Sequence, residues 1–391
     1  MNIITGKSIP EFFSQAPISP NVKVSVVIPV QNEEKYIFQC LAAFSKQTDV
    51  YGNKLDPDQF EILVLANNCH DKSVELTAQF QSENPDLNLY FEEVILPTEL
   101  SNIGYVRKTL MDSAFKRLIQ NGHGTIMTTD GDTRVSPDWI AQTISEIGRG
   151  AEVVGGRIEL YTDELHGLDQ FARLLHLKDE RYRLLVAELE GKIIGDKYDP
   201  VPRHHQHFNG SFAITTDCYE RSGGVPVVKH LEDCAFFDRL QTFDAKIRHS
   251  FNVLVSTSAR CAGRAQIGLS QQLNEWKNYN NSIENYYVES CDSVEKRLNT
   301  KRNLITVWQL KNKINRTEFY NMIKGNIPET IALDYDLFIG CCYFGEWFAQ
   351  ISKHENDAGN ISKEPIEEAI ENLEKMLLKS PQQDFVQTSI L

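Results

Sequence analysis

Between residues 24 and 160, short apolar runs alternate with longer amphipathic stretches, and this alternation limits the fold more than any other feature of the sequence. The run VSVVIPV at residues 24–30 is rich in β-branched residues and has no polar face, which is typical of a strand buried on both sides. Further strands are predicted at residues 60–66, 87–96, 125–129, 152–160, 209–215 and 246–256. Strands that alternate with helices indicate a mostly parallel sheet in three layers, an α/β fold.

Capping residues between these strands predict where the helices begin. Asn32 is a candidate N-cap, and Glu33 and Glu34 would lie at the positive end of the helix dipole. Ser136 is expected to cap a later helix, with Pro137 at its first position. Other helical stretches are predicted from residue 71 or 73 onward and at residues 104–120, 163–190 and 231–240, with a polar loop at 191–208.

The length and composition are those of a folded protein with a large core, since 391 residues include 41% hydrophobic ones. A net charge of −14 argues against nucleic acid as the main partner, because binding to the phosphate backbone relies on clustered basic residues.

The N-terminal stretch has no long apolar run, so we expect no signal peptide. Residues 337–351 are apolar, but Glu346 interrupts them and they are too short to span a bilayer, so we expect a buried helix and no integral membrane segment.

The cysteines are scattered, with no CxxC pair and no zinc-finger spacing. We interpret them as reduced thiols of a cytoplasmic protein. They are Cys40, Cys69, Cys218, Cys234, Cys261, Cys291, Cys341 and Cys342.

The sequence Asp130-Gly131-Asp132 directly follows the predicted strand at residues 125–129. It places two hard oxygen ligands on one turn, which suits a divalent cation that takes its other ligands from water and substrate phosphates. Asp-rich turns also occur as plain helix caps or solvated loops, so the motif alone is a weak signal.

Four further landmarks stand in a fixed order around this turn, and together they are far more specific than any one of them. They read VVIPVQNE at residues 26–33, NNCHDKS at 67–73, NIGYVR at 102–107 and HLEDCAFFDRL at 230–240. With them, residues 22–264 resemble the family 2 glycosyltransferases of the GT-A fold, a Rossmann-like α/β fold. The corresponding family elements are VSVVIPxxNEE, DDxSxDxS, NxGxxxAR, DxD and EDxxxxxRL.

The resemblance implies a hexosyltransferase-type, inverting enzyme that moves a sugar from a nucleotide-sugar donor to a hydroxyl acceptor. Mn²⁺ or Mg²⁺ at Asp130 and Asp132 would bridge the donor's diphosphate and stabilise the charge that develops as the glycosidic bond breaks. The aspartate of the fourth landmark, Asp233, is implied to be the general base, with Glu232 positioning the acceptor or the base.

The resemblance also implies donor contacts along the carboxyl ends of the first strands. They would come from Pro29, Gln31, Glu33, Asn67, Arg107, Asp130, Gly131, Gly210 and Arg264. Arg107, Arg260 and Arg264 could reach the phosphates, although exposed arginines are also common on surfaces. Gly210 would allow close approach of the donor sugar, because it has no Cβ.

The chain departs from the family pattern at the end of the second strand, where Asn67 follows Ala66 in place of two aspartates. An amide can donate as well as accept hydrogen bonds, so the base of the nucleotide stays open between UDP, which is more frequent in the family, and GDP. The membrane-pore segments and the QxxRW element of processive polysaccharide synthases are not recognisable, which favours single transfer.

The organisation expected is an N-terminal extension (1–21), a GT-A nucleotide-sugar-binding and catalytic domain (22–269) and a helical C-terminal region (270–391). The long stretch around residues 171–185 is interpreted as packing or as a subunit contact in a homodimer. The Arg203-His-His-Gln-His207 sequence matches no fixed metal-ligand spacing, so a solvated or acceptor-facing loop is expected there.

Two other functions remain open. A sugar-phosphate nucleotidyltransferase also combines an α/β fold with acidic metal ligands, but no Gly-rich, basic phosphate loop follows the first strand. A non-catalytic binding or scaffold protein could keep the same fold, although Asp130, Asp132 and Asp233 are all retained.

Overall fold

The computed structural model describes residues 2–3, 11–228, 230–261, 268–279, 283–327, 331, 333–356 and 361–379. The chain forms two compact units. The first consists of residues 1–173, 206–241 and 245–278, and the second of residues 174–205, 242–244 and 279–391. The second unit therefore takes a segment from the middle of the chain, whereas we expected one boundary near residue 270.

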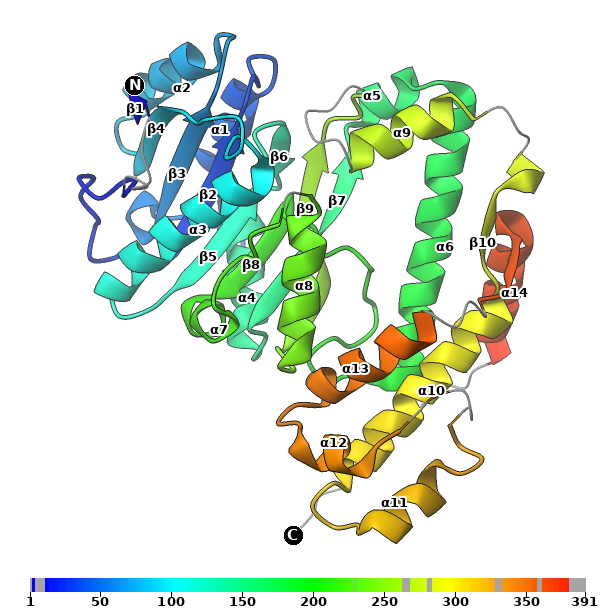
Figure 1. Ribbon diagram of the computed structural model, residues 1–391. Coiled ribbons are helices and arrows are strands. Elements are labelled where there is room, and N and C mark those ends of the chain that lie inside the picture. Colours follow the sequence, from blue (N-terminus) through cyan, green and yellow to red (C-terminus); the bar gives the residue numbers. More distant parts are fainter. Residues whose placement is uncertain are drawn as a thin grey trace. The chain divides into compact units, whose positions relative to one another are not determined.

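The first unit is built on a mixed, mostly parallel sheet, which has nine strands in the described part of the chain (Figure 1). Their order across the sheet is β1 (Asn2–Ile3), β4 (Leu89–Ile95), β3 (Phe60–Asn67), β2 (Val24–Val30), β5 (Thr125–Thr129), β8 (Ser211–Thr215), β7 (Val153–Leu160), β9 (Ile247–Thr257) and β6 (Thr133–Val135). Antiparallel pairs are β5 with β8, β7 with β8 and β6 with β9, and the other pairs are parallel. The α/β fold class expected from the sequence is confirmed.

The helices of this unit follow the strands closely. They are α1 (Ile37–Phe44), α2 (Ser73–Glu83), α3 (Ile103–Gln120), α4 (Trp139–Gly148), α5 (Thr162–Gly167), the start of α6 (Gln170–Ile194), α7 (Thr216–Ser222), α8 (Glu232–Thr242) and α9 (Leu269–Lys277), with a short 3₁₀ helix at Pro57–Gln59.

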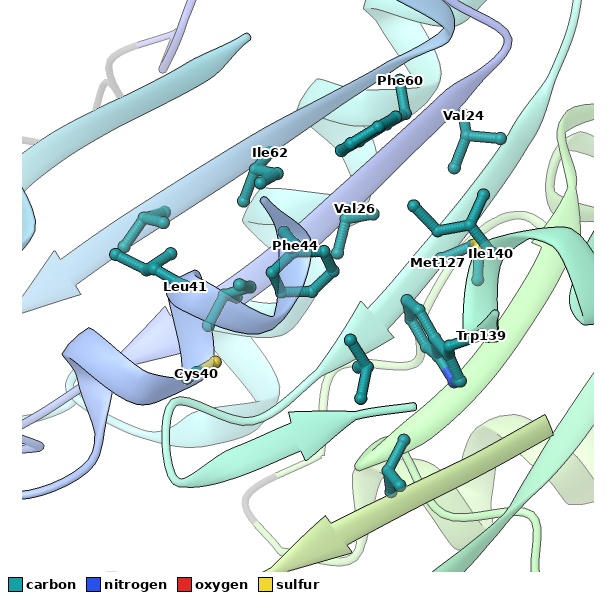
Figure 2. Close-up of a cluster of buried hydrophobic side chains, with 14 of the residues drawn as sticks. Val24, Val26, Cys40, Leu41, Phe44, Phe60, Ile62, Met127, Trp139 and Ile140 are labelled. Carbon is teal, nitrogen blue, oxygen red and sulfur yellow. The ribbon is translucent and has the colours of Figure 1, made fainter. Parts of the chain in front are cut away.

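One face of the sheet is covered by α1, α2 and α4. Alternate residues of β2, such as Val26 and Ile28, point into this core, because successive strand side chains face opposite sides. Phe44 from α1 and Trp139 from α4 meet there in an edge-to-face contact with ring centroids 6.2 Å apart (Figure 2). The indole N–H of Trp139 donates to Ser211 Oγ at 3.0 Å, so this fully buried ring also anchors β8.

The opposite face is covered by α3, which packs on β2, β3 and β5 and carries buried Val106, Leu110 and Ala114 toward them. Helices α7 and α8 lie on the same side, where Phe236 of α8 contacts the rings of Phe212 and Tyr219. Helices on both faces make the predicted three layers.

Two predicted helix starts are wrong by several residues. Asn32 is not an N-cap: its φ of 56° belongs to the left-handed region that Asn tolerates in turns, and α1 begins only at Ile37. Likewise, α4 begins at Trp139 rather than at Pro137, because Ser136 and the two residues after it form a turn in which the Trp139 N–H donates to the Ser136 carbonyl.

The helix expected at residues 163–190 is two helices, α5 and α6. The chain leaves the helical conformation at Leu168, which is extended, and Asp169 then accepts hydrogen bonds from the N–H groups of Phe171 and Ala172 at the start of α6. Helix α6 continues to Ile194, four residues beyond the predicted end.

A buried ion pair attaches residues 13–17 to the sheet. The guanidinium of Arg117 in α3 lies 2.5 Å from Glu61 of β3, and it also donates to the carbonyls of Phe13, Ala16 and Pro17. Both charged side chains are buried, so each depends on the other for stabilisation.

The second unit is helical, as expected for the C-terminal region. Besides α6 it contains α10 (Cys291–Gln309), α11 (Arg316–Ile323), α12 (Tyr335–Gly340), α13 (Phe344–Asn356), α14 (Ile366–Lys379), a 3₁₀ turn at Ile283–Asn285 and a two-stranded antiparallel sheet of β10 (Tyr287–Glu289) and β11 (Lys363–Pro365). Leu185, Val294 and Leu373 represent one core, formed by α6, α10 and α14.

The apolar stretch at 337–351 forms the end of α12 and most of α13, which pack around Trp347 and Phe338 in a second core. It is therefore not one helix but two, separated at residues 341–343. Among the described residues, no helix is both long and apolar enough to cross a membrane.

Candidate active site

The turns that follow β2 and β5 lie side by side, because these strands are adjacent and parallel and their carboxyl ends meet at one edge of the sheet. Glu33 comes from the first turn and the Asp130-Gly131-Asp132 sequence from the second. A Cβ on Gly131 would lie only 3.1 Å from Glu33 Cγ, so a larger residue here would require the Glu33 side chain to shift by a few tenths of an ångström.

Asp130 is the more accessible of the two aspartates, with 39% of its side chain exposed. Its Oδ1 accepts a hydrogen bond from Arg107 Nη2 at 2.5 Å. Its other oxygen, Oδ2, lies 3.3 Å from the position that a Cβ on Gly210 would occupy. The absence of a side chain at Gly210 therefore leaves that oxygen uncovered.

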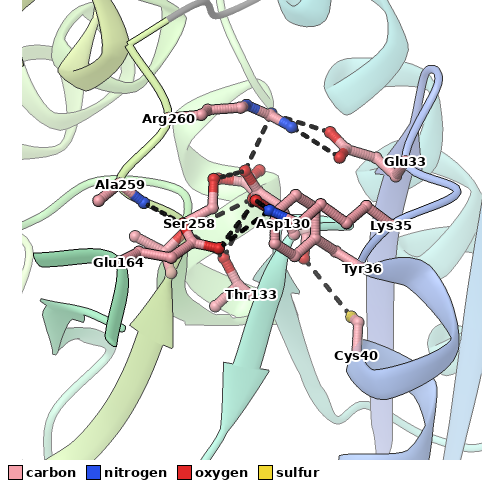
Figure 3. Close-up of polar contacts among 12 residues, drawn as sticks. Glu33, Lys35, Tyr36, Cys40, Asp130, Thr133, Glu164, Ser258, Ala259 and Arg260 are labelled. Atoms are coloured by element: carbon pink, nitrogen blue, oxygen red, sulfur yellow. Dashed lines mark hydrogen bonds and ion pairs between the residues drawn. The ribbon is translucent and has the colours of Figure 1, made fainter. Parts of the chain in front are cut away.

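Asp132 is buried and points to the loop after β9. Ser258 Oγ donates to its Oδ2 at 3.0 Å, and Arg260 Nη2 lies 2.9 Å from the same oxygen. Ser258 and Arg260 are labelled in Figure 3. The hydroxyl of Tyr161 donates to its backbone carbonyl at 2.9 Å. Burial raises the pKa of the Asp132 carboxyl above its usual range, even though Arg260 acts in the opposite direction.

Arg107 is almost completely buried, at 2% exposure, and lies between two carboxylates. Its Nη2 binds Asp130, and its Nε lies 3.6 Å from Glu232 Oε1 in α8. Its Nη1 donates to the hydroxyl of Thr128 and approaches the carbonyl of Asn209. The surface-exposed alternative considered for Arg107 is therefore wrong.

Glu232 and Asp233 open α8, and the two carboxylates differ in environment. Glu232 is buried next to Arg107 and receives a hydrogen bond from Asn209 Nδ2 at 3.4 Å, and burial raises the pKa of its carboxyl. Asp233 is half-buried, and its Oδ1 accepts the N–H of Cys234. Of the two, Asp233 is the carboxylate with access to solvent.

The start of α3 touches the segment that leads into α8. A Cβ on Gly104 would lie 2.6 Å from the Val228 carbonyl oxygen and 3.3 Å from Glu232 Cβ. Leu231, between these two residues, has a φ of 54°, an unfavourable conformation for a leucine that the surrounding contacts must stabilise. The position of the Glu232-Asp233 pair thus depends on close packing at Gly104.

The remaining predicted donor contacts lie around the same edge. Pro29 is paired in register with Leu65 near the end of β2, and half-buried Gln31 follows that strand. Asn67 is the buried last residue of β3. The prediction for Arg264 falls outside the described residues.

The Arg203–His207 segment is not a metal site within the described residues. Arg203 forms ion pairs with Asp199 at 2.6 Å and Glu190 at 2.8 Å in the second unit. In the first unit, His207 stacks on Phe237 with ring centroids 3.7 Å apart. The observed contacts are structural ones.

The ion pair between Glu33 and Arg260 was not predicted from the sequence. Arg260 Nη1 and Nη2 lie 2.7 and 2.9 Å from the two carboxylate oxygens of Glu33. Nor did the sequence single out Glu164 of α5, which accepts the Ala259 N–H at 2.8 Å and so holds the loop that carries Arg260. Tyr36 donates to the other Glu164 oxygen at 2.9 Å (Figure 3). These contacts span up to 227 residues of sequence, and no local pattern signals them.

The oxygen donors at this edge fit a hard divalent cation such as Mg²⁺ or Mn²⁺. Glu33, Asp130, Asp132, Glu232 and Asp233 contribute five carboxylates, whereas Arg107 and Arg260 contribute two positive charges. In the part of the chain that the structure describes, no three acidic, His or Cys side chains form a complete metal cage. A cation here would therefore need ligands from water and from a bound substrate.

Residues 25–190 match the sequence model of "Glycosyl transferase family 2". The match covers 166 of the 391 residues, which is less than half of the chain. The matched residues include both turns and Arg107, whereas Gly210, the Glu232-Asp233 pair and Arg260 lie beyond them.

A curated relative is "Glycosyltransferase AglE" from Haloferax volcanii, which is 29% identical over 137 residues. The aligned part is 35% of this chain and only 39% of that protein.

Two solved structures show a weaker likeness, with TM-scores below 0.5. The mannosyltransferase PcManGT from Pyrobaculum calidifontis, in complex with GDP-Man and Mn²⁺, has a TM-score of 0.43 and 13% identity, covering 94% of this chain and 84% of that one. TarS 1–349 from S. aureus with UDP has a TM-score of 0.43 and 13% identity, covering 94% and 95%. Scores of this size do not establish more than a general similarity.

None of the eight cysteines, all of which lie among the described residues, forms a disulfide. Cys40 is buried beneath the site and its Sγ donates to the Asp130 carbonyl at 3.5 Å. Burial raises the pKa of its thiol, which favours the protonated form.

Proposed function

We propose that this protein transfers a glycosyl group from a nucleotide-sugar donor to a hydroxyl acceptor, with inversion at the anomeric carbon and with a divalent cation. The observation that carries the proposal is the meeting of Asp130, Asp132 and Glu33 with the start of α8, in a chain whose residues 25–190 match the family 2 model. Asp130 and Asp132 would hold the cation, which stabilises the negative charge of the departing diphosphate.

The chain's own residues would orient the donor around this point. Arg107 fixes one oxygen of Asp130, which leaves the other directed toward Gly210, where the donor sugar would approach. Gln31 and Asn67, at the ends of β2 and β3, would contact the nucleotide. UDP is the favoured nucleotide, and GDP is the alternative because the Asn67 amide can both donate and accept hydrogen bonds.

Asp233 would act as the general base toward the acceptor hydroxyl. It is the more exposed member of the pair at the start of α8, whereas Glu232 is engaged by Arg107. A carboxylate of ordinary basicity suffices, because the hydroxyl becomes acidic only as its oxygen attacks the sugar. Glu232 would position this base rather than exchange a proton itself.

The proposal is tested by measuring how UDP-glucose, UDP-N-acetylglucosamine, GDP-mannose, UDP and GDP shift the melting temperature, with and without Mn²⁺. One nucleotide series should stabilise the protein, and more strongly with Mn²⁺. Asp132→Asn should lose the Mn²⁺-dependent part of the affinity in calorimetry, because it removes a charge from the cation site. Asp58→Asn, an exposed change in the same unit, is the matched control and should behave as wild type.

The two alternative functions, a sugar-phosphate nucleotidyltransferase and a non-catalytic binding or scaffold protein, would give different results in such assays. A nucleotidyltransferase would release pyrophosphate from a nucleoside triphosphate and a sugar phosphate. A non-catalytic binding or scaffold protein would not hydrolyse the nucleotide sugar in the presence of metal, even if it bound it. Equal Mn²⁺-dependent nucleotide affinity in wild type and Asp132→Asn would contradict the assignment of the cation site.

A further inference from the structure

Arg260 connects the two acidic turns of the site from a third element. It lies three residues after β9, and its guanidinium forms a two-pronged ion pair with Glu33, with nitrogen–oxygen distances of 2.7 and 2.9 Å. The nitrogen Nη2 is shared, since it also lies 2.9 Å from Asp132 Oδ2 (Figure 3). One positive charge is therefore shared by two carboxylates that come from different turns.

The oxygen of Asp132 that faces Arg260 is also the one that a cation would need. Oδ1 is oriented toward the hydroxyls of Thr133 and Thr257, at 3.5 and 3.4 Å, and the side chain is largely buried. A divalent cation and a guanidinium cannot both contact Oδ2 closely, because like charges a few ångströms apart repel each other. Cation binding at Asp132 and the present position of Arg260 are thus mutually exclusive.

Arg260 can leave Asp132 without losing all its partners. Glu33 still holds it through Nη1, which lies 2.7 Å from Glu33 Oε2, so a rotation of the side chain would free Nη2. Its Nε is buried and has no hydrogen-bond partner among the described residues. A phosphate oxygen would supply an acceptor for such donors, and planar two-pronged binding of phosphate is a property of arginine.

We propose that Arg260 is a built-in competitor of the metal: it occupies the carboxylates of Asp132 and Glu33 in the free protein, and it moves from Asp132 to the donor's diphosphate when cation and donor bind together. This inference rests on the proposed function and adds to it an order of events. The free protein binds the cation weakly, because Arg260 must first be displaced. The donor provides the new partner for Arg260, so donor and cation bind cooperatively.

The test compares Mn²⁺ binding to the full-length protein and its variants without any nucleotide, by electron paramagnetic resonance of free Mn²⁺ or by calorimetry. Arg260→Gln removes the competitor and should bind Mn²⁺ about tenfold more tightly than wild type, a typical size for coupling between two sites. A gain of affinity cannot result from misfolding. In the same variant, UDP or GDP should increase the Mn²⁺ affinity much less than in wild type.

Lys35→Gln is the matched control, because it removes the same charge from an exposed side chain near the site that pairs with Glu164 rather than with Asp132. Its Mn²⁺ affinity should stay within about twofold of wild type, as expected for a screened surface charge. If Arg260→Gln binds Mn²⁺ no more tightly than Lys35→Gln does, Arg260 is not a competitor and the inference is overturned. If wild type binds neither Mn²⁺ nor nucleotide under any condition, the proposed function fails instead.

Discussion

Replacing Gly104 with alanine should disturb the site through packing alone, since Gly104 carries no functional group. Its added Cβ would lie 2.6 Å from the Val228 carbonyl oxygen, and this atom belongs to the backbone and cannot rotate away. The start of α3 and the segment leading into α8 must therefore separate by about 0.8 Å to reach the 3.4 Å of an ordinary contact. Glu232, whose Cβ is 3.3 Å from the same position, would move with that segment.

The expected effects follow from this displacement. Overpacking of a tight contact typically costs about 1–3 kcal/mol, and the better helix propensity of alanine returns up to ~1 kcal/mol, so the free energy of unfolding should fall by roughly 1–2 kcal/mol. A misplacement of about 1 Å at a reacting group can lower turnover about 100-fold, so kcat should fall between about tenfold and 100-fold. The KM for the donor should change less, because Asp130 and Asp132 lie on a different turn.

The assay is Mn²⁺-dependent hydrolysis of the nucleotide sugar that stabilises the protein most, together with urea unfolding. Gly148→Ala is the matched control: this glycine ends α4, and a Cβ there would meet no atom within 4 Å. This control should keep wild-type kcat and be as stable as wild type or slightly more so. A Gly104→Ala variant with unchanged kcat and unchanged stability would refute the inference that packing at Gly104 sets the position of α8.

Three further substitutions test other parts of the molecule. Asp233→Asn should lower kcat for transfer at least ~100-fold while calorimetric donor affinity stays close to wild type, since a general base contributes about that much; normal turnover would exclude Asp233 as the base. Arg117→Met should lower the free energy of unfolding in urea by roughly 3–5 kcal/mol, because it leaves the buried Glu61 carboxylate without its cation. In the second unit, burial opposes ionisation of Glu190, but Lys301 and Arg203 outweigh it and hold the pKa of its carboxyl well below the usual 4.5. Ionised Glu190 contributes its full stabilisation above pH 4.5, and this contribution is lost as the pH falls below 4.5. Glu190→Gln should therefore reduce the fall in melting temperature between about pH 5 and pH 3. An unchanged pH profile would contradict the stabilising role of Glu190.

The strands of the first unit were predictable because their sequences are compatible with few other secondary structures. VSVVIPV and FEILVLA form β2 and β3 at the predicted positions, since long β-branched apolar runs are stable only where both faces of the strand are buried. The Asp-Gly-Asp turn was found from the abrupt change from apolar to turn-forming residues after β5. The direction of β8 was not predictable, because strand propensity does not depend on whether a neighbour is parallel.

Most side-chain contacts in the site could not be predicted from the sequence. Arg107 was expected near the phosphates, but only the structure places it between Asp130 and Glu232. The pairing of Glu33 with Arg260 depends on the order of strands in the sheet, which brings the ends of β2 and β9 toward the same turn. The wrong helix start at Asn32 has a local cause, since a residue that suits an N-cap suits a left-handed turn equally well.

The single guanidinium of Arg107 contacts two carboxylates with different proposed roles, Asp130 in holding the cation and Glu232 in positioning the general base. Substitutions at these two positions should therefore not be independent: in a double-mutant cycle the second replacement would have a smaller effect than it has alone, because the shared arginine is already released. Attempts to redesign acceptor preference at the start of α8 would, for the same reason, alter metal use unless Arg107 keeps a compensating partner.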